Sequence, residues 1–434
     1  MPDPTLRART GAISACLLLV ALAFLLVAPA KSGAAEDQYR TVFRFGPVQT
    51  ERTAKAPSVR DTWKVPLDQV GATAVRTPPS TPRESDVRDC TRHDNAKSGE
   101  GRVHNRFLWC QKWFAEAKLF LGGLEIGHGR IDFTAVGYGR DDGDRSVRIF
   151  LRSDGADWDG WFFTGGGSIM GLWADCAPAT QPWCASGGET AAQTLGEWND
   201  DRSWHEWNIA SNENGSNSPD KVLRHKWQLN GYARDSDGRE YDQLASPQHT
   251  IRCDSANYFS SFGDDLPKAC VFDDVIPHLR YSVNDPRVSQ VARHIRDAQN
   301  RPDMTYPMTG GKVIPGKYTG DRDDPGLHRV PGDSSTALGN RDYARWACNS
   351  TGPFVGIGLP QPPGPGQECD EYPFASTEEG AASPDWDFSV RAVSGTQNRA
   401  AGGLLNWFYT SDRILYGNDE YYVEITDDVP TPGG

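Results

Sequence analysis

Residues 369–376 read Cys-Asp-Glu-Tyr-Pro-Phe-Ala-Ser, and this stretch decides the interpretation of the C-terminal part of the chain. Two adjacent acids, Asp370 and Glu371, stand at the start of a short aromatic run. Downstream, the pattern predicts a strand through 388–393, a helix over 398–409, and a closing hairpin whose arms are 413–416 and 421–425 around Gly417-Asn418-Asp419. The order therefore predicts a small α+β unit of strand, strand, helix and hairpin.

These residues resemble the NucA/NucB deoxyribonuclease family. The likeness rests on 369–376, on Glu379-Gly380, and on the run Asn398-Arg399-Ala-Ala-Gly, and it covers roughly 369–425. A weaker likeness extends upstream through a helix near 285–300 and His328-Arg329. The resemblance implies a secreted, divalent-metal-dependent endonuclease that acts on DNA through a compact ββα-metal-like core. It implies nothing about residues 36–275.

The resemblance also suggests roles for individual residues. It implies that Asp370 is the base or orients the attacking water, and that Glu371 is its partner or a metal ligand. Asn398 and Glu379 are candidate ligands of Mg²⁺ or Mn²⁺, which prefer oxygen donors. Arg399 is the candidate phosphate contact.

Each of these residues has a structural alternative. An Asp-Glu pair before aromatic residues is ordinarily a solvated strand edge, and Asn398 suits a helix N-cap. Glu379 could end a hairpin, and Arg399 could pair with an acid. His328 is a candidate base if the carboxylates only hold metal.

The N-terminus has the pattern of an export signal. Arg7 and Arg9 precede an apolar run over 12–27, and small residues follow, so 1–35 is predicted to be a signal peptide. The alternative is a retained N-terminal anchor. We expect the mature chain to be extracellular and to have no further membrane span.

Cysteine usage agrees with export. Apart from Cys16 in the apolar run, eight cysteines fall into four close pairs along the sequence, which favours disulfides over a zinc site because no C-x-x-C pair is present. Pairing between sequence neighbours is favoured only by proximity. A Cys348–Cys369 bridge would pin the strand that leads into Asp370. The eight residues are Cys90, Cys110, Cys176, Cys184, Cys253, Cys270, Cys348 and Cys369.

The formal charge of −13 has the wrong sign for binding nucleic acid by bulk electrostatics. A DNA substrate would need a local basic patch, a bound cation, or both. Among the arginines near the motif, Arg391, Arg399 and Arg413 are the candidates for such a patch. The length predicts two domains, a β-rich one over 36–275 with an extended N-terminal arm and a nuclease-like one over 276–434.

The predicted β-rich domain is rich in tryptophan. Ten of the 14 Trp lie between Trp109 and Trp227, and they indicate either the core of a sandwich-like fold or an aromatic platform for sugars or bases. Alternating apolar residues over 131–135 and 147–151 predict a hairpin. A helix is expected to begin at Pro286, directly after Asp285, with His294 as a surface or packing residue. Residues 307–339 are expected to form a long loop.

Three functions fit these patterns. The leading one is a secreted endonuclease that hydrolyses DNA phosphodiester bonds with little sequence preference. The alternative is a non-catalytic extracellular carbohydrate- or surface-binding protein with a degenerate nuclease module. A third is a toxin whose N-terminal domain targets a cell surface.

Overall fold

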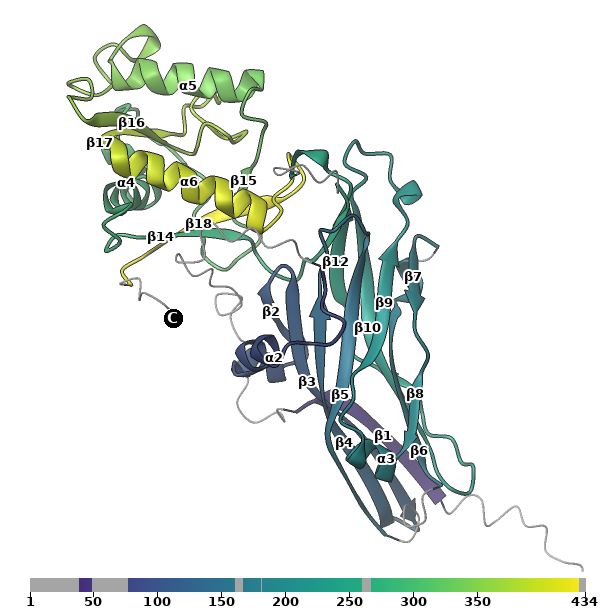
Figure 1. Ribbon diagram of the computed structural model, residues 1–434. Coiled ribbons are helices and arrows are strands. Elements are labelled where there is room, and N and C mark those ends of the chain that lie inside the picture. Colours follow the sequence, from purple (N-terminus) through teal and green to yellow (C-terminus); the bar gives the residue numbers. More distant parts are fainter. Residues whose placement is uncertain (1–38, 49–76, 161–166, 181, 260–266, 429–434) are drawn as a thin grey trace, which may run out of the picture.

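The computed structural model describes residues 39–48, 77–160, 167–180, 182–259 and 267–428, so the expected signal peptide lies outside the described residues. The chain is α+β, with a mostly-strand N-terminal region and few helices there. In the described part of the chain, no helix is both long and apolar enough to cross a membrane. Figure 1 shows an elongated β-rich region with the C-terminal elements gathered at one end.

The β-rich region contains two antiparallel sheets. The first has the order β1-β3-β4-β5-β9-β7, with β2 paired to β3, and the second has the order β13-β12-β10-β6-β8, with β11 paired to β10. The strands of the first sheet are β1 (Tyr39–Pro47), β2 (Arg102–Asn105), β3 (Leu108–Leu121), β4 (Leu124–Tyr138), β5 (Ser146–Asp159), β7 (Cys184–Gly187) and β9 (His205–Ser211). Those of the second are β6 (Ile169–Cys176), β8 (Ala191–Thr194), β10 (Leu223–Arg234), β11 (Leu244–Ala245), β12 (His249–Asp254) and β13 (Ala269–Phe272).

The predicted hairpin is confirmed, because β4 pairs antiparallel with β5. Its alternating apolar residues, from Ile131 to Leu151, belong to a hydrophobic cluster that includes residues of both sheets. The outer face of β4 and β5 is covered by α2 (Glu84–Thr91), which Cys90 links to β3 through Cys110. A second short helix, α3 (Leu195–Asp200), packs against β5. Part of the expected N-terminal arm is strand β1 at the edge of the first sheet.

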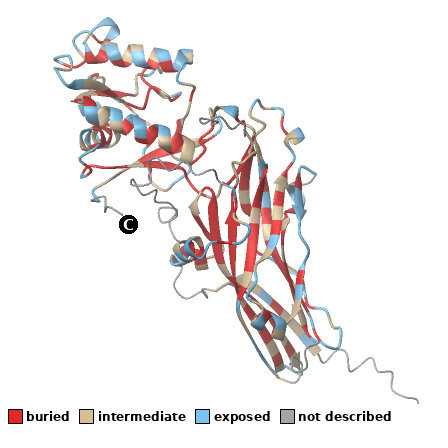
Figure 2. Ribbon diagram, viewed as in Figure 1, coloured by how far each residue is buried: buried red, intermediate tan, exposed pale blue. Residues whose placement is uncertain are grey.

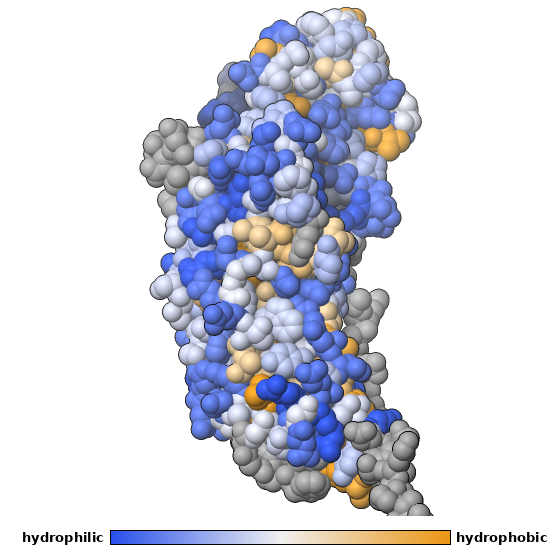
Figure 3. All heavy atoms as spheres, turned by 90° about the vertical axis from the view of Figure 1, so that its right-hand side faces the viewer, coloured by the Kyte–Doolittle hydropathy of each residue, from blue (hydrophilic) through white to orange (hydrophobic). Residues whose placement is uncertain are grey.

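Five tryptophans of this region are fully buried, which favours the core interpretation of the tryptophan-rich sequence. Figure 2 shows buried residues running along the strands, and on the face in Figure 3 hydrophobic residues form small areas separated by hydrophilic ones. Trp158 and Trp183 are the exposed tryptophans among the described residues, with 38% and 41% of their surface accessible. The buried ones are Trp109, Trp113, Trp198, Trp207 and Trp227.

The C-terminal region, as far as the structure describes it, has two small sheets and three α-helices. β18 is the central strand of one sheet, parallel to β14 and antiparallel to β15, and β16 pairs antiparallel with β17 in the other. Figure 1 shows α5 on one side of β16 and β17, with α4 and α6 on the other. The elements are β14 (His278–Ser282), α4 (Ser289–Asn300), β15 (Leu327–His328), α5 (Ser335–Cys348), β16 (Gln367–Tyr372), β17 (Ser389–Ser394), α6 (Gly395–Ser411) and β18 (Glu420–Thr426).

Three expectations for this region were inaccurate. The helix expected from Pro286 begins at Ser289, after a turn in which the Val288 N–H donates to the Asp285 carbonyl oxygen at 3.1 Å. The closing hairpin was wrong, because 413–416 does not pair with β18 and β18 instead pairs with β14 and β15. The loop expected through 339 was also wrong at its end, where α5 begins at Ser335. The buried face of α5 consists mainly of alanines, so the apolar signal for this helix is weak.

The eight cysteines form four disulfides between sequence neighbours: Cys90–Cys110, Cys176–Cys184, Cys253–Cys270 and Cys348–Cys369. Disulfides persist in oxidising compartments, so these four are consistent with an extracellular protein.

Candidate active-site cleft

A cleft of about 320 Å³ is lined by residues of β16, α5 and α6. β16 contributes Asp370 and Glu371 to its lining. The sequence motif at 369–376 therefore lies at the wall of a cavity. The other polar residues that line it come from five separate segments: Arg329, Arg341, Ser376, Asn398, Asn406, Tyr409 and Tyr416.

Asp370 is nearly buried and is held by a histidine. The Asp370 Oδ2 atom lies 2.6 Å from Nδ1 of His294, and Nε2 of the same ring lies 2.8 Å from the Ser389 Oγ atom. When Asp370 is ionised, Nδ1 donates to it and Nε2 accepts from the serine hydroxyl. Of the two expectations for His294, the surface position was wrong, since its ring is fully buried; it is a buried residue that also bonds the central acid of the motif.

Glu371 occupies the opposite face of β16, because successive side chains of a strand alternate. Its carboxyl lines both the main cleft and a smaller hollow next to α5. Burial, and secondly the negative charge of Asp370, raise its pKa to about 7, although the Ala375 amide and Arg341 act in the opposite direction. Near neutral pH this carboxyl is poised between its two protonation states.

Asn398 lies one turn inside α6, which begins at Gly395 and not at Asn398 as the sequence suggested. Its Nδ2 atom donates to Glu368 at 3.2 Å, which leaves the amide at the wall of the cleft. The same helix face contributes Gly402, where a Cβ atom would meet nothing within 4 Å. The missing side chain therefore leaves open space on this wall of the cleft.

The arginines that line the cleft are Arg329 and Arg341, not those expected from the sequence. In the described part of the chain neither forms an ion pair; each donates to a backbone carbonyl, of Ile414 at 2.9 Å and of Gly332 at 2.6 Å. Two cations that form no ion pair among the described residues therefore face the cavity, and Arg341 lies near enough to Glu371 to lower the pKa of that carboxyl. By contrast, the three expected arginines are all paired with acids: Arg391 with Asp297, Arg399 with Glu368, and Arg413 with Asp254.

Glu379 lies outside the lining of the cleft, next to His328 and Glu378. Its carboxylate accepts from the His328 backbone N–H at 2.9 Å and lies 2.7 Å from Nδ1 of that ring. The hydrogen bond to Glu379 raises the pKa of His328. Ligand atoms of these three residues lie within 4.8 Å of one another, so they form a second place, apart from Asn398, that suits a cation.

The loop after β16 is fixed by a buried amide. The Nδ2 atom of Asn340 donates to the carbonyl oxygens of Ala375 and Thr377 at 3.0 and 2.8 Å, and Oδ1 accepts from Ala382 N. A Cβ atom at Gly380 would come within 2.2 Å of this amide, which explains the glycine in the motif. The Cys348–Cys369 disulfide ties the same helix to β16.

The sequence held a signal for one of the residues that it failed to assign. His294 follows Val291 by three positions, so it lies on the apolar face of α4, where a polar side chain needs a buried partner. No comparable local pattern marks Arg341 or Arg329, which reach the cleft only through the tertiary fold.

Comparison with known proteins agrees with this geometry. Neither a search of curated proteins nor one of solved structures found a significant match. The family model described as deoxyribonuclease NucA/NucB matches residues 339–424, the span that contains Asp370, Glu371 and Asn398. This C-terminal part of the chain therefore carries a domain of the NucA/NucB deoxyribonuclease family.

Proposed function

We propose that the cleft beside β16 belongs to a secreted, divalent-metal-dependent endonuclease that hydrolyses DNA phosphodiester bonds with little sequence preference. The observation that carries the proposal is that Asp370, Glu371 and Asn398, all within the family match, line one cavity together with two arginines that form no ion pair among the described residues. The arginines and amides of the lining are groups that can contact phosphate, and phosphate contacts carry no sequence information.

Asp370 is proposed as the base. His294 occupies its Oδ2 atom, and no described residue bonds Oδ1, so Oδ1 is the oxygen that would take a proton from water in the cleft. The water oxygen then bonds to phosphorus as the bond to the leaving oxygen breaks. His294, held in turn by Ser389, keeps the carboxylate in one orientation during this step.

The donor set of the cleft fits a hard divalent cation. Glu371 and Asn398 offer carboxylate and amide oxygens, the ligands that Mg²⁺ and Mn²⁺ prefer. The raised pKa of Glu371 shows a carboxyl whose negative charge is poorly compensated, and a cation beside it would favour the ionised form. Such an ion would supply positive charge for the phosphate and the leaving oxygen. Glu379, with His328 and Glu378, is proposed as a separate cation site.

Arg329 and Arg341 are proposed to hold the phosphates on either side of the scissile bond. A guanidinium that lacks a carboxylate partner can donate to phosphate without first breaking an ion pair. Arg399, at the rim on α6, would have to release Glu368 to do the same. The net negative charge of the whole chain disfavours DNA binding, but these two arginines supply positive charge locally, at the cleft.

The succession of β16, β17 and α6 supports a ββα-metal-like core for this domain. We place the domain boundary near residue 275, because β14 already pairs with β18. The four disulfides support export, and the signal peptide expected at 1–35 would provide it. The non-catalytic alternative finds less support, since most described tryptophans of the β-rich region are not exposed.

The test is cleavage of supercoiled plasmid by the oxidised mature chain in Mg²⁺ or Mn²⁺, with EDTA as the metal-free arm. Asp370→Asn should lose at least 100-fold in rate, on the order expected for removal of a general base. Asp385→Asn is the matched control, because Asp385 is an exposed acid near the motif. Intact plasmid with the wild type in every condition, or equal cutting by Asp370→Asn, would overturn the proposal.

The phosphate contacts have their own control pair on α5. Arg341→Ala should raise KM for DNA, whereas Arg345→Ala, one turn further along and paired with Asp342, should not. Equal KM values for the two variants would remove Arg341 from the site.

A further inference from the structure

Arg329 lies where the β-rich region meets the C-terminal region. Its guanidinium carbon is 4.5 Å from the centroid of the Tyr409 ring and 4.6 Å from that of Tyr416, both in the C-terminal region. It is also 5.7 and 5.4 Å from the rings of Tyr258 and Phe259, which follow β12 in the β-rich region. A cation that faces the cleft is thus enclosed by aromatic rings from both regions.

Tyr258 connects this cage to the body of the β-rich region. Its ring centroid is 3.9 Å from that of Tyr416, and its hydroxyl accepts a hydrogen bond from the Tyr416 backbone N–H at 3.0 Å. The same hydroxyl donates to the Asp220 carboxylate at 2.7 Å. One side chain of the β-rich region therefore fixes both a wall of the cleft and its neighbour Arg329.

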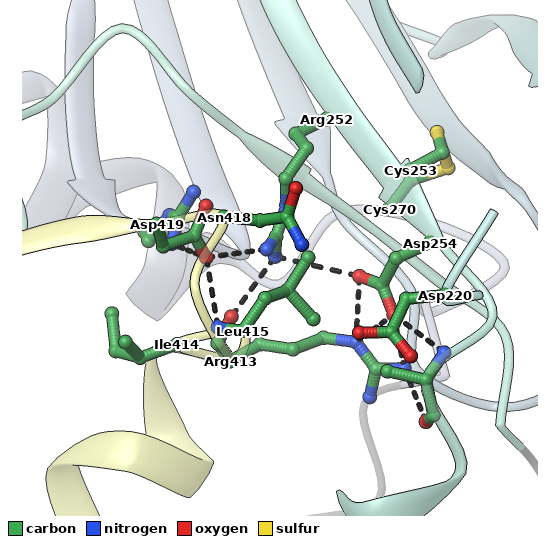
Figure 4. A network of polar contacts seen from close by, with 12 residues as sticks. Asp220, Arg252, Cys253, Asp254, Cys270, Arg413, Ile414, Leu415, Asn418 and Asp419 are labelled. Atoms are coloured by element: carbon green, nitrogen blue, oxygen red, sulfur yellow. Dashed lines mark hydrogen bonds and ion pairs between the residues drawn. A yellow bond between two sulfur atoms is a disulfide. The ribbon is translucent and has the colours of Figure 1, made fainter. Parts of the chain in front are cut away.

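Buried ion pairs hold the loop between α6 and β18, residues 412–419, against the β-rich region (Figure 4). Arg252 of β12 bonds both Asp419 and the Arg413 carbonyl oxygen, the latter at 3.0 Å. Arg106, which follows β2, donates to Asp419 at 3.3 Å. In return, the Arg413 side chain reaches Asp254 at 2.8 Å. The two arginines of the β-rich region are fully buried, so these bonds have little freedom to rearrange.

We propose that the β-rich region is a working part of the cleft and that Tyr258 is a positioning residue for DNA phosphate binding by Arg329. Tyr416, in the loop that the buried ion pairs hold, lines the cleft beside Arg329. An Arg329 guanidinium kept at one place loses less freedom when it binds phosphate. The inference rests on the proposed DNase function, and it gives the tryptophan-rich half of the chain a role in substrate binding rather than in targeting.

A double-mutant cycle in the full mature chain tests this role. DNA cleavage would be measured at several salt concentrations for Tyr258→Ala, Arg329→Gln and the double variant. Each single change is expected to raise KM about tenfold, with a smaller effect on kcat, as for loss of one charge-assisted hydrogen bond. Each should also reduce the slope of log KM against log salt by about one phosphate contact. If Tyr258 acts through Arg329, the double variant is no worse than Arg329→Gln alone.

Tyr232→Ala serves as the control, because Tyr232 is a half-buried tyrosine of β10 in the same region. It should leave KM and the salt slope unchanged. If Tyr258→Ala does not fold, Tyr258→Phe replaces it in the cycle, since it keeps the ring and loses only the two hydroxyl bonds, with about a threefold effect expected. Additive effects, or an unchanged KM for the Tyr258 variant used, would overturn the inference.

The failure of the proposed function would look different. A wild type that leaves DNA intact would overturn that function, and amide hydrogen exchange of residues 412–419 would then decide the structural part of the inference. Faster exchange of this loop in the Tyr258 variant, with no change in Tyr232→Ala, would support the connection. Equal exchange in all variants would overturn it.

Discussion

Replacing Glu371 by glutamine should stabilise the protein at alkaline pH. The wild-type carboxyl has a pKa of about 7 in the fold against an ordinary value of 4.5, chiefly because it is buried. A shift of this size corresponds to about 3 kcal/mol, and partial exposure of the side chain reduces the expected figure to about 2 kcal/mol.

The sign follows from linkage. A group whose pKa is higher in the folded state binds protons more tightly there. Its favourable contribution to the free energy of unfolding is therefore complete below about pH 4.5 and is lost as the pH rises through about 7. Glutamine is neutral at every pH, so the variant does not lose stability in this way as the pH rises. The difference in unfolding free energy between Glu371→Gln and the wild type should therefore shift by about 2 kcal/mol in favour of the variant between pH 4 and pH 8.5.

The measurement is urea unfolding at several pH values in EDTA, which prevents a bound cation from offsetting the charge. Glu189→Gln is the matched control, because Glu189 is an exposed acid of the β-rich region. A difference for Glu371→Gln that stays flat with pH, or that matches the Glu189 control, would refute the reasoning. Addition of Mg²⁺ should reduce the pH-dependent difference in unfolding free energy between Glu371→Gln and the wild type if Glu371 helps to hold the ion.

Other parts of the site give separate expectations. Gly402→Leu should fill the cleft and lower the rate of DNA cleavage at least tenfold. Gly403→Leu is the control, because Gly403 is equally open but lies outside the lining, and this variant should cleave DNA at the wild-type rate. Comparable rates for the two variants would contradict the placement of the cleft. Removing Cys348–Cys369 by a double alanine change should cost about 3 kcal/mol in urea unfolding for a loop of this length, and a loss below about 1 kcal/mol would argue against it. His294→Gln should lower kcat more than it raises KM, because it releases Asp370 while leaving the phosphate contacts; an unchanged kcat in steady-state assays would exclude this role.

The sequence predicted those elements whose signals are local. The β4–β5 hairpin, β17 and α6 follow directly from alternation or helical spacing, and neighbouring cysteines gave the disulfide pairs. Helix α5 was not predicted, because its buried side chains are small and include Asn340, which bonds a loop rather than filling a core.

The cleft itself could be predicted only in part. The motif located Asp370, Glu371 and Asn398, but nothing local distinguishes an arginine that faces a cavity from one that pairs with an acid. Arg391, Arg399 and Arg413 were the arginines expected from the sequence, yet each has a carboxylate partner in the fold. Arg329 and Arg341 have none among the described residues, and this difference depends on how segments distant in the sequence are brought together.

The central position of β18 has a consequence for biosynthesis. This strand lies between β14 and β15, and its pairing with β14 joins residues 278–282 to 422–426. During translation β14 leaves the ribosome long before its partner exists, so the C-terminal sheet closes only after nearly all of the domain has been made. A nascent or truncated chain that stops before Glu420 would keep the motif at 369–376 and its β16–β17 sheet but lack the central strand of the β14-β18-β15 sheet. If the chain is the nuclease proposed above, we therefore expect it to become active only after β18 has been made, which would limit damage to nucleic acid inside the cell that makes it.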